Sequence, residues 1–335
     1  MAATYGGSKK DKYLTTTTTS SGCTSSGIEG TSFSTPIASG IIALTLQANQ
    51  NLTWRDIQHL IVLTSTRNGF SDTYSDWATN AAGKEYSQVL GFGLMDAEAM
   101  VKRAVTWNLV PDQQMCTTST KYSSVSTSGS AYSRDTTTVI SSDCSVITFL
   151  EHVTVTISFS YTQYRGATEL YLVSPGGTTS HLLHFRYTDA AKFQYSGSLK
   201  WTFMSVHFWR ESPAGTWTLK LRSYSGLSVV TLNSWTLTLY GTLADPLPYI
   251  DQCSNITCQN NGTCINRVYK YSCQCLEGYA GIDCETTKYN SDSQITARIV
   301  GLSVVGAVLV VAVIITPIII KSKCASTFKV APAAA

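Results

Sequence analysis

Hydrophobic residues among the first hundred positions recur at the spacing of helices. An apolar run over residues 41–48 follows a loop rich in glycine, serine and threonine, and it predicts a buried helix. A second helix is expected to begin after Thr53 and to end near Ser65, because Thr53 and Asp56 have the spacing of a capping box. Its inner face is predicted to consist of Trp54, Ile57, Leu60 and Ile61.

Two further elements are indicated in this region. A third helix is predicted over residues 97–105, with Asp96 as its N-cap and with Lys102 and Arg103 near its end, where the helix dipole favours positive charge. The β-branched run at residues 15–19 favours a strand or hairpin. The N-terminal third therefore predicts an α/β arrangement.

Between residues 109 and 243 the hydrophobic period changes to two. Apolar residues alternate with threonine, serine and lysine in several runs, and glycine and proline clusters separate these runs. Such a pattern is typical of an antiparallel sandwich or jelly roll. The aromatic side chains Trp201, Phe203, Phe208 and Trp209 are expected in the core or in contacts between domains.

Charge and cysteine content narrow the class of protein. Only 13% of the residues are charged, the net charge is +3 and no dense Lys/Arg patch occurs, so nothing suggests nucleic-acid binding. Six of the ten cysteines lie within residues 253–285 in the pattern C-x4-C-x5-C-x8-C-x-C-x8-C, which is the spacing of an EGF-like module. Spacing alone allows fifteen pairings, and this density indicates an oxidising compartment. Residues 244–252 are expected to be a stiff linker.

The C-terminal region predicts a membrane anchor. Residues 299–320 carry no charge and would span about 33 Å as a helix. A polar stalk over residues 286–298 precedes this segment, and a tail over residues 321–335 follows it with more positive charge than the stalk side, so the tail is expected in the cytosol. We therefore expect a single-pass type I membrane protein of the secretory pathway, in the Golgi, endosomes or at the cell surface.

The stretch Gly-Thr-Ser-Phe-Ser-Thr-Pro-Ile-Ala-Ser-Gly at residues 30–40 carries the candidate chemistry. Pro36 suits a first helical turn, and Ser32 would lie at the positive end of the helix, where backbone N–H groups can bind an oxyanion. Taken alone, the Gly-Thr-Ser tripeptide would favour Ser32 as a helix N-cap. The whole stretch, however, resembles the nucleophile segment of the subtilisin clan, and residues 40–60 resemble its kexin and furin branch. The resemblance implies that Ser32 is a nucleophile.

The partners of a catalytic serine are not evident in this sequence. In the subtilisin chain order the Asp and the His precede the Ser, but no histidine precedes Ser32. The Asn of the family's oxyanion hole is also absent, and the N-terminus has no secretory signal. We therefore expect the sequence to be the C-terminal part of a longer precursor, with residues 1–108 as the end of a peptidase domain, and we expect no hydrolysis by this chain alone.

Residues 109–243 are similar to the P domain (homo B) that follows the protease in kexin and furin. The resemblance implies a disulfide between Cys116 and Cys144. For the EGF-like module it implies the pairs Cys253–Cys264, Cys258–Cys273 and Cys275–Cys284.

Calcium and glycosylation are further expectations. The family resemblance implies calcium as a cofactor, with most of its ligands outside this chain. Asp251, Gln252 and Asn266 are weak calcium candidates, because they partly match the calcium-binding EGF modules; the alternative is a disulfide-held spacer. Sequons at Asn51, Asn255 and Asn261 predict glycosylation in a lumenal domain.

The resemblance as a whole implies a membrane-anchored, calcium-dependent serine endopeptidase. Its substrates would be secretory proproteins with paired basic residues. The alternative is a catalytically inert surface protein in which the P and EGF-like domains mediate binding or adhesion.

Overall fold

The computed structural model describes most of the chain up to Lys288. The described ranges are residues 1–9, 13–17, 22–24, 26–67, 76–129, 131–140, 142–192, 195–224, 228–247, 253, 256–266 and 271–288. The chain divides into two compact units, of which the first holds residues 1–256 and 265–272 and the second holds residues 257–264 and those from 273 onward.

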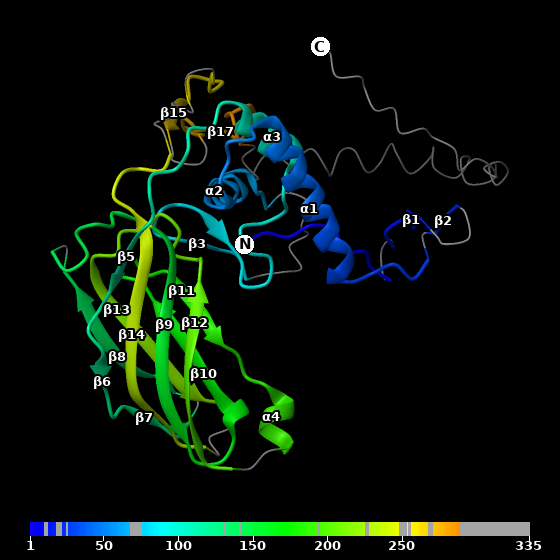
Figure 1. Ribbon diagram of the computed structural model, residues 1–335. Helices are drawn as coiled ribbons and strands as arrows, with labels where there is room; N and C mark the ends of the chain where they lie inside the picture. The colour runs from blue at the N-terminus through cyan, green and yellow to red at the C-terminus, as the bar shows by residue number, and fades with distance from the viewer. Residues whose placement is uncertain are drawn as a thin grey trace, which may run out of the picture. The chain divides into compact units, whose positions relative to one another are not determined.

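Three helices dominate the N-terminal segment (residues 1–108), as Figure 1 shows in blue and cyan. They are accompanied by two short antiparallel hairpins, β1 with β2 and β3 with β4. The bounds are β1 Thr16–Thr17, β2 Cys23–Thr24, α1 Thr31–Ala48, α2 Trp54–Thr64, β3 Ala78–Thr79, β4 Glu85–Tyr86 and α3 Ala97–Val105. The predicted bounds of the third helix and the hairpin at the threonine run are thus confirmed.

Local capping explains where two helices begin. Thr53 and Asp56 form a full capping box at the start of α2, and the Asp96 carboxylate accepts a hydrogen bond from the Ala99 amide at the start of α3 (2.9 Å). Both caps agree with the prediction. The predicted place of Pro36 was wrong, because α1 begins at Thr31 and Pro36 therefore lies in its second turn rather than its first.

Two expectations about buried helix faces were wrong. Trp54 is 62% exposed. The buried face of α2 includes the polar residues Asp56 and His59, and Trp54 lies outside this face. Helix α1 buries only Thr45, and its apolar residues Ile37 and Leu44 are exposed, because it packs mainly against α3.

The first residues of the chain pair with the segment that leads into α3. Ala3 forms a parallel bridge with Leu94, and Leu94 pairs on its other side with Thr66. Gly91 and Gly93 allow this approach, since a Cβ at either position would lie within about 2.3 Å of a carbonyl oxygen of the neighbouring segment.

Residues 114–242 form the predicted antiparallel sandwich, drawn in green and yellow in Figure 1. One sheet has the order β11-β10-β13-β8, and the other has the order β12-β9-β14-β5, with β6 and β7 also paired to β14. The strands are β5 Gln114–Thr117, β6 Lys121–Tyr122, β7 Ser126–Thr127, β8 Ser133–Val139, β9 Phe149–Tyr161, β10 Thr168–Val173, β11 Thr179–Leu183, β12 Gly197–Ser205, β13 Gly215–Ser223 and β14 Val230–Thr242; the short helices are η1 Arg165–Ala167 and α4 Tyr187–Lys192.

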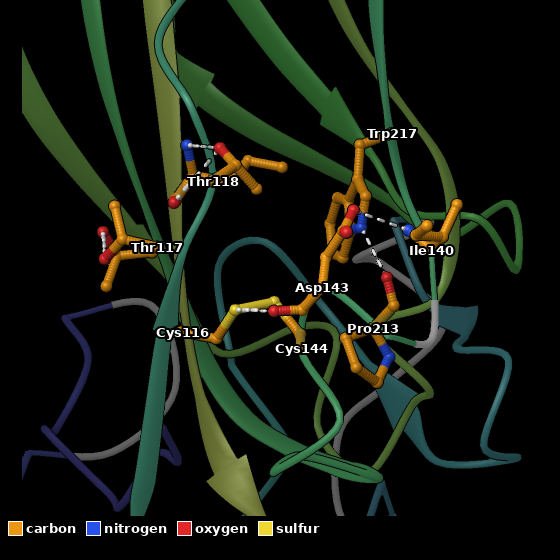
Figure 2. Close-up of a disulfide and its surroundings, with 10 residues drawn as sticks. Cys116, Thr117, Thr118, Ile140, Asp143, Cys144, Pro213 and Trp217 are labelled. Atoms are coloured by element: carbon orange, nitrogen blue, oxygen red, sulfur yellow. Dashed lines mark hydrogen bonds between the residues drawn. A yellow bond between two sulfur atoms is a disulfide. The ribbon is translucent and has the colours of Figure 1, made fainter.

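The inward-facing residues of both sheets form one hydrophobic core. Trp217 and Phe208 are fully buried in it and meet edge to face, with ring centroids 5.1 Å apart. Figure 2 shows the Cys116–Cys144 disulfide beside this core, where the Trp217 indole N–H donates to the Pro213 carbonyl. The packing expectation was wrong for Trp201, which is 59% exposed because its strand, β12, lies at the edge of the sheet.

The cysteine-rich region contains two small sheets, β15 with β16 and β17 with β18. Disulfides join Cys258 to Cys273 and Cys275 to Cys284, and Cys253 and Cys264 are also disulfide-bonded. The strands are β15 Thr263–Asn266, β16 Tyr271–Gln274, β17 Tyr279–Ala280 and β18 Thr286–Thr287. No helix within the described ranges is long and apolar enough to cross a membrane, and the predicted anchor at residues 299–320 lies outside those ranges.

Candidate active site

Ser32 is the second residue of α1, at the helix end where backbone amides lack intrahelical partners. Gly30 occupies the N-cap position with φ 130° and offers no side chain to those amides. The Phe33 amide donates to the Gly30 carbonyl at 3.0 Å, which leaves the amides of Thr31 and Ser32 at the open end. An oxyanion could therefore be stabilised there by N–H groups and by the helix dipole.

The Ser32 hydroxyl is exposed, and within the described part of the chain it makes no side-chain hydrogen bond. Its neighbours differ in this respect. The hydroxyls of Ser34 and Thr35 both donate to the Thr31 carbonyl, at 2.9 and 3.0 Å. The Ser32 hydroxyl is thus available for chemistry, unlike those of Ser34 and Thr35.

Pro36 affects the same turn from the second turn of the helix. In an α-helix its nitrogen would donate to the carbonyl four residues earlier, which is that of Ser32, but proline has no N–H. The Ser32 carbonyl is therefore freed from the regular helical ladder.

A hollow of about 530 Å³ lies beside this helix end. It is bounded by the N-terminal residues 2–7, by the start of α1 and by Val89 and Leu90. Its wall consists mainly of glycine, alanine and threonine, and from the first turn of α1 it includes Thr31 and Ser34 but not Ser32. Thr4 fixes one side, because its hydroxyl donates to the Ser34 carbonyl at 2.7 Å.

The described structure brings no histidine into hydrogen-bond contact with Ser32, and the five histidines have other neighbours. His59 bonds to Glu151, His152 stacks on Tyr240, and His207 packs against Tyr86 with ring centroids 4.6 Å apart. His181 lies between the rings of Tyr171 and His184. His184 and His207 lie just after the ends of β11 and β12.

His59 instead belongs to a buried ionic cluster between α2 and the sandwich. The carboxylate of Glu151, on β9, is bound by His59 Nε2 at 2.8 Å, by Gln113 and by the Arg55 guanidinium. Burial alone would raise the pKa of Glu151, but the hydrogen bonds from His59, Arg55 and Gln113 outweigh it and lower that pKa to about 2. A carboxylate that is ionised at neutral pH thus joins the N-terminal helices to the sandwich.

A second polar contact joins the β3–β4 turn to the sandwich. The Asn80 side chain donates to the carbonyls of His207 and Trp209, both at 3.0 Å. The Glu211 carboxylate accepts from the Ala81 amide at 3.0 Å and from the hydroxyl of Ser174 at 2.5 Å. Two separate clusters therefore hold the segment that carries Ser32 against the sandwich.

Asp56 organises the end of the N-terminal segment. Besides its capping role, it accepts from the Trp107 indole N–H and from the Val110 amide, both at 2.8 Å. Burial would raise the pKa of Asp56, but its hydrogen bonds to Thr53, Val110 and Trp107 lower it overall.

These clusters were not predicted from the sequence. The one available signal for Glu151 was a carboxylate at the start of an otherwise alternating apolar strand. The residues around Arg55 and those around Glu211 show no sequence motif or spacing that would predict these contacts.

Family models match three parts of the chain. Residues 2–93 match the subtilase family, residues 150–239 match the proprotein convertase P-domain and residues 252–283 match the EGF-like domain. Furin from Bos taurus is 41% identical over 250 residues, which cover 74% of this chain and 30% of furin. The chain belongs to the furin-like proprotein convertases.

Other convertases give similar matches. Proprotein convertase subtilisin/kexin type 5 from Rattus norvegicus is 42% identical over 259 residues, covering 73% of this chain and 14% of that protein. Proprotein convertase subtilisin/kexin type 6 from Homo sapiens is 40% identical over 257 residues, which cover 73% of this chain and 26% of that protein. The chain thus spans less than a third of the length of these relatives.

Solved structures support the fold. A serine protease of Aeromonas sobria superposes with a TM-score of 0.54 at 24% identity, over 64% of this chain and 44% of that chain. The same protease in complex with its chaperone gives a TM-score of 0.56 at 22% identity, over 66% of this chain and 45% of the protease chain. These two superpositions support the fold over about two thirds of the chain.

The remaining expected sites are only partly described. No group of three or more metal-ligating side chains that could hold a metal ion occurs within the described ranges. Of the calcium candidates, Asp251 and Gln252 lie outside those ranges, and the side chain of Asn266 is not described. Asn51 and Asn261 are exposed, and Asn255 is again outside.

Proposed function

We propose that this chain is the nucleophile-bearing part of a membrane-anchored, calcium-dependent serine endopeptidase that processes secretory proproteins at paired basic residues. The observation that carries the proposal is the place of Ser32, whose hydroxyl is exposed and unengaged at an open helix N-terminus, next to Thr31, which borders the hollow. The similarity to furin over three quarters of the chain supports the same reaction class.

In the proposed reaction the Ser32 hydroxyl attacks the scissile carbonyl, and a general base takes its proton. The Ser32 amide and the dipole of α1 stabilise the oxyanion that forms. The His and Asp of the triad, the Asn of the oxyanion hole and most calcium ligands are expected outside these residues.

A chimaera tests this proposal. The part of bovine furin that precedes its segment similar to this chain is joined to this chain, and cleavage of a fluorogenic peptide with paired arginines is measured. We expect cleavage that depends on calcium, and a loss of at least about a thousandfold in kcat/KM for Ser32→Ala. Ser39→Ala is the matched control, because Ser39 lies on the same helix outside the hollow and its hydroxyl is bound to the Thr35 carbonyl, and it should leave the rate unchanged.

A secreted, folded chimaera without cleavage would contradict the peptidase proposal. That outcome would favour the alternative, an inert binding or adhesion protein. This chain alone is expected not to cleave the peptide.

A further inference from the structure

The open edge of the sandwich carries a groove that the proposed peptidase chemistry does not use. It has a volume of about 290 Å³ and is lined by Leu183 on β11, by Leu199, Trp201 and Phe203 on β12, and by Arg165, Arg186 and Asp189. The three β12 residues alternate along the strand, so they face the same side.

The groove has an apolar floor that the fold leaves partly uncovered. Leu199 and Phe203 are partly buried and pack against the sandwich core, whereas Trp201 between them is 59% exposed. Its indole N–H has no hydrogen-bond partner among the described residues. An exposed tryptophan between two anchored apolar residues is typical of an interface hot spot.

The backbone beside this floor is also unpaired. Strand β12 has nine residues and, within the described chain, pairs only with β9, so its outer edge presents free N–H and C=O groups. It contains no proline and one charge, Lys200, so it has little of the protection that edge strands usually carry. At its far end, Ser205 bonds to Ser180 of β11 at 2.8 Å and closes the sandwich.

A charged rim lies near the beginning of β12. Gly197 pairs with Tyr161 at the end of β9, and Arg165 follows that strand end. Both Arg165 and Arg186 bond to the same oxygen of Asp189, at 3.0 and 3.1 Å, so two positive charges share one negative charge. Arg186 uses all three guanidinium nitrogens, whereas Nη1 of the half-exposed Arg165 remains available to an anion.

We propose that this groove binds an extended peptide of another protein, which adds as an antiparallel strand to β12. The peptide carries apolar side chains at alternate positions, one of them packing on Trp201, and an acidic residue towards its C-terminal end that pairs with Arg165. An antiparallel strand places its C-terminal end at the start of β12, where the charged rim lies, and only another strand matches the row of free backbone groups.

The test is a selection on the full chain with a displayed library of random nine-residue peptides. We expect enrichment of peptides with alternating apolar residues and a carboxylate near the C-terminal end. Trp201→Ser and Arg165→Glu should each weaken the enriched peptides by at least about tenfold. Tyr122→Ser is the matched control, because Tyr122 is an 80% exposed aromatic residue on β6, away from the groove, and it should leave binding unchanged.

N-methylation of the strongest peptide tests strand addition directly. Methyl groups on one alternate set of amides should abolish binding, and those on the other set should not, because only one set faces β12. The thermal unfolding of each variant shows whether the sandwich still folds.

Several results would overturn the proposal. They are the absence of enriched peptides, a preference for basic peptides, equal binding to the Trp201→Ser chain and equal effects of the two methylated sets. Self-association of the chain that Trp201→Ser abolishes would also overturn it, in favour of edge pairing between two copies.

Discussion

At the scale of single residues, Glu151 is bound by three side chains, two of them from helix α2 and one from the segment before β5. Its side chain is 1% exposed, and Arg55, His59 and Gln113 satisfy its carboxylate. Removing the charge leaves the Arg55 guanidinium largely buried without its partner, and such a broken pair costs more than the intact pair contributes. Stability at the boundary between helices and sandwich is thus sensitive to this one side chain.

We expect Glu151→Gln to lower the free energy of unfolding by about 3 kcal/mol. Urea unfolding followed by tryptophan fluorescence measures this change. Glu98→Gln is the matched control, because Glu98 forms an exposed i,i+4 pair with Lys102, and its loss should leave the urea midpoint close to that of the parent. Equal losses in the two variants would contradict the role given to Glu151.

At the scale of elements, helix α2 combines a cap with a possible modification signal. The Thr53 hydroxyl accepts from the Asp56 amide at 3.2 Å and lies 2.5 Å from the Asp56 carboxylate, and the same threonine completes the sequon of Asn51. One hydroxyl therefore serves the start of the helix and the proposed glycosylation motif.

Thr53→Ala is expected to lower the free energy of unfolding by about 1 kcal/mol, because the capping box is lost. Thr53→Ser keeps the hydroxyl and should stay close to the parent in urea unfolding. Asn51→Gln removes the sequon but leaves the capping box intact. If this variant, measured without glycosylation, lost as much free energy of unfolding as Thr53→Ala, the capping explanation would be contradicted.

At the scale of the whole molecule, buried titratable groups make stability depend on pH. Burial, helped by the positive charge of the N-terminus, lowers the pKa of His207 from 6.5 to about 4, and burial beside His184 lowers that of His181 to about 4. The unfolded chain takes up these protons below pH 6.5, but the folded chain does so only near pH 4. Stability is therefore lost as the pH falls from about 6.5 to about 4.

Glu151 acts at lower pH. Its folded pKa of about 2 lies below the ordinary value of 4.5, so its contribution is present above pH 4.5 and is lost as the pH falls towards 2. We expect urea midpoints to decline in both windows. His207→Phe keeps a ring against Tyr86 but cannot be protonated, so it should flatten the decline between pH 6.5 and 4; an unchanged slope would count against His207.

Limited proteolysis compares the two parts of the first unit. Helix α1 leaves Ile37, Leu44 and Leu46 exposed, whereas the sandwich has one continuous core and a disulfide. We expect trypsin to cut within residues 1–108 well before it cuts the sandwich, as mass spectrometry of the fragments would show. Equal resistance throughout would contradict this expectation.

The parts of this fold that the sequence predicted are those with local causes. Helix α3 and the capping box of α2 followed from residues three or four positions apart, and the sandwich followed from strict alternation. The exposure of Trp201 depends on β12 being an edge strand, and the partners of Glu151 come from residues 38 to 96 positions away. Such features depend on strand order and tertiary packing, which a periodic pattern does not specify.

Leu247 connects the segment after the sandwich to the N-terminal helices. It follows the last strand of the sandwich, yet its side chain is 7% exposed and packs with Leu60, Met100 and Trp107 of the N-terminal helices. A shortened protein that stops at Thr242 would open a cavity among those helices at a distance in sequence of more than a hundred residues. A shortened version made for crystallisation should therefore keep the residues up to Leu247. Without them, the packing of the N-terminal helices would be weakened even though the deletion lies next to the sandwich.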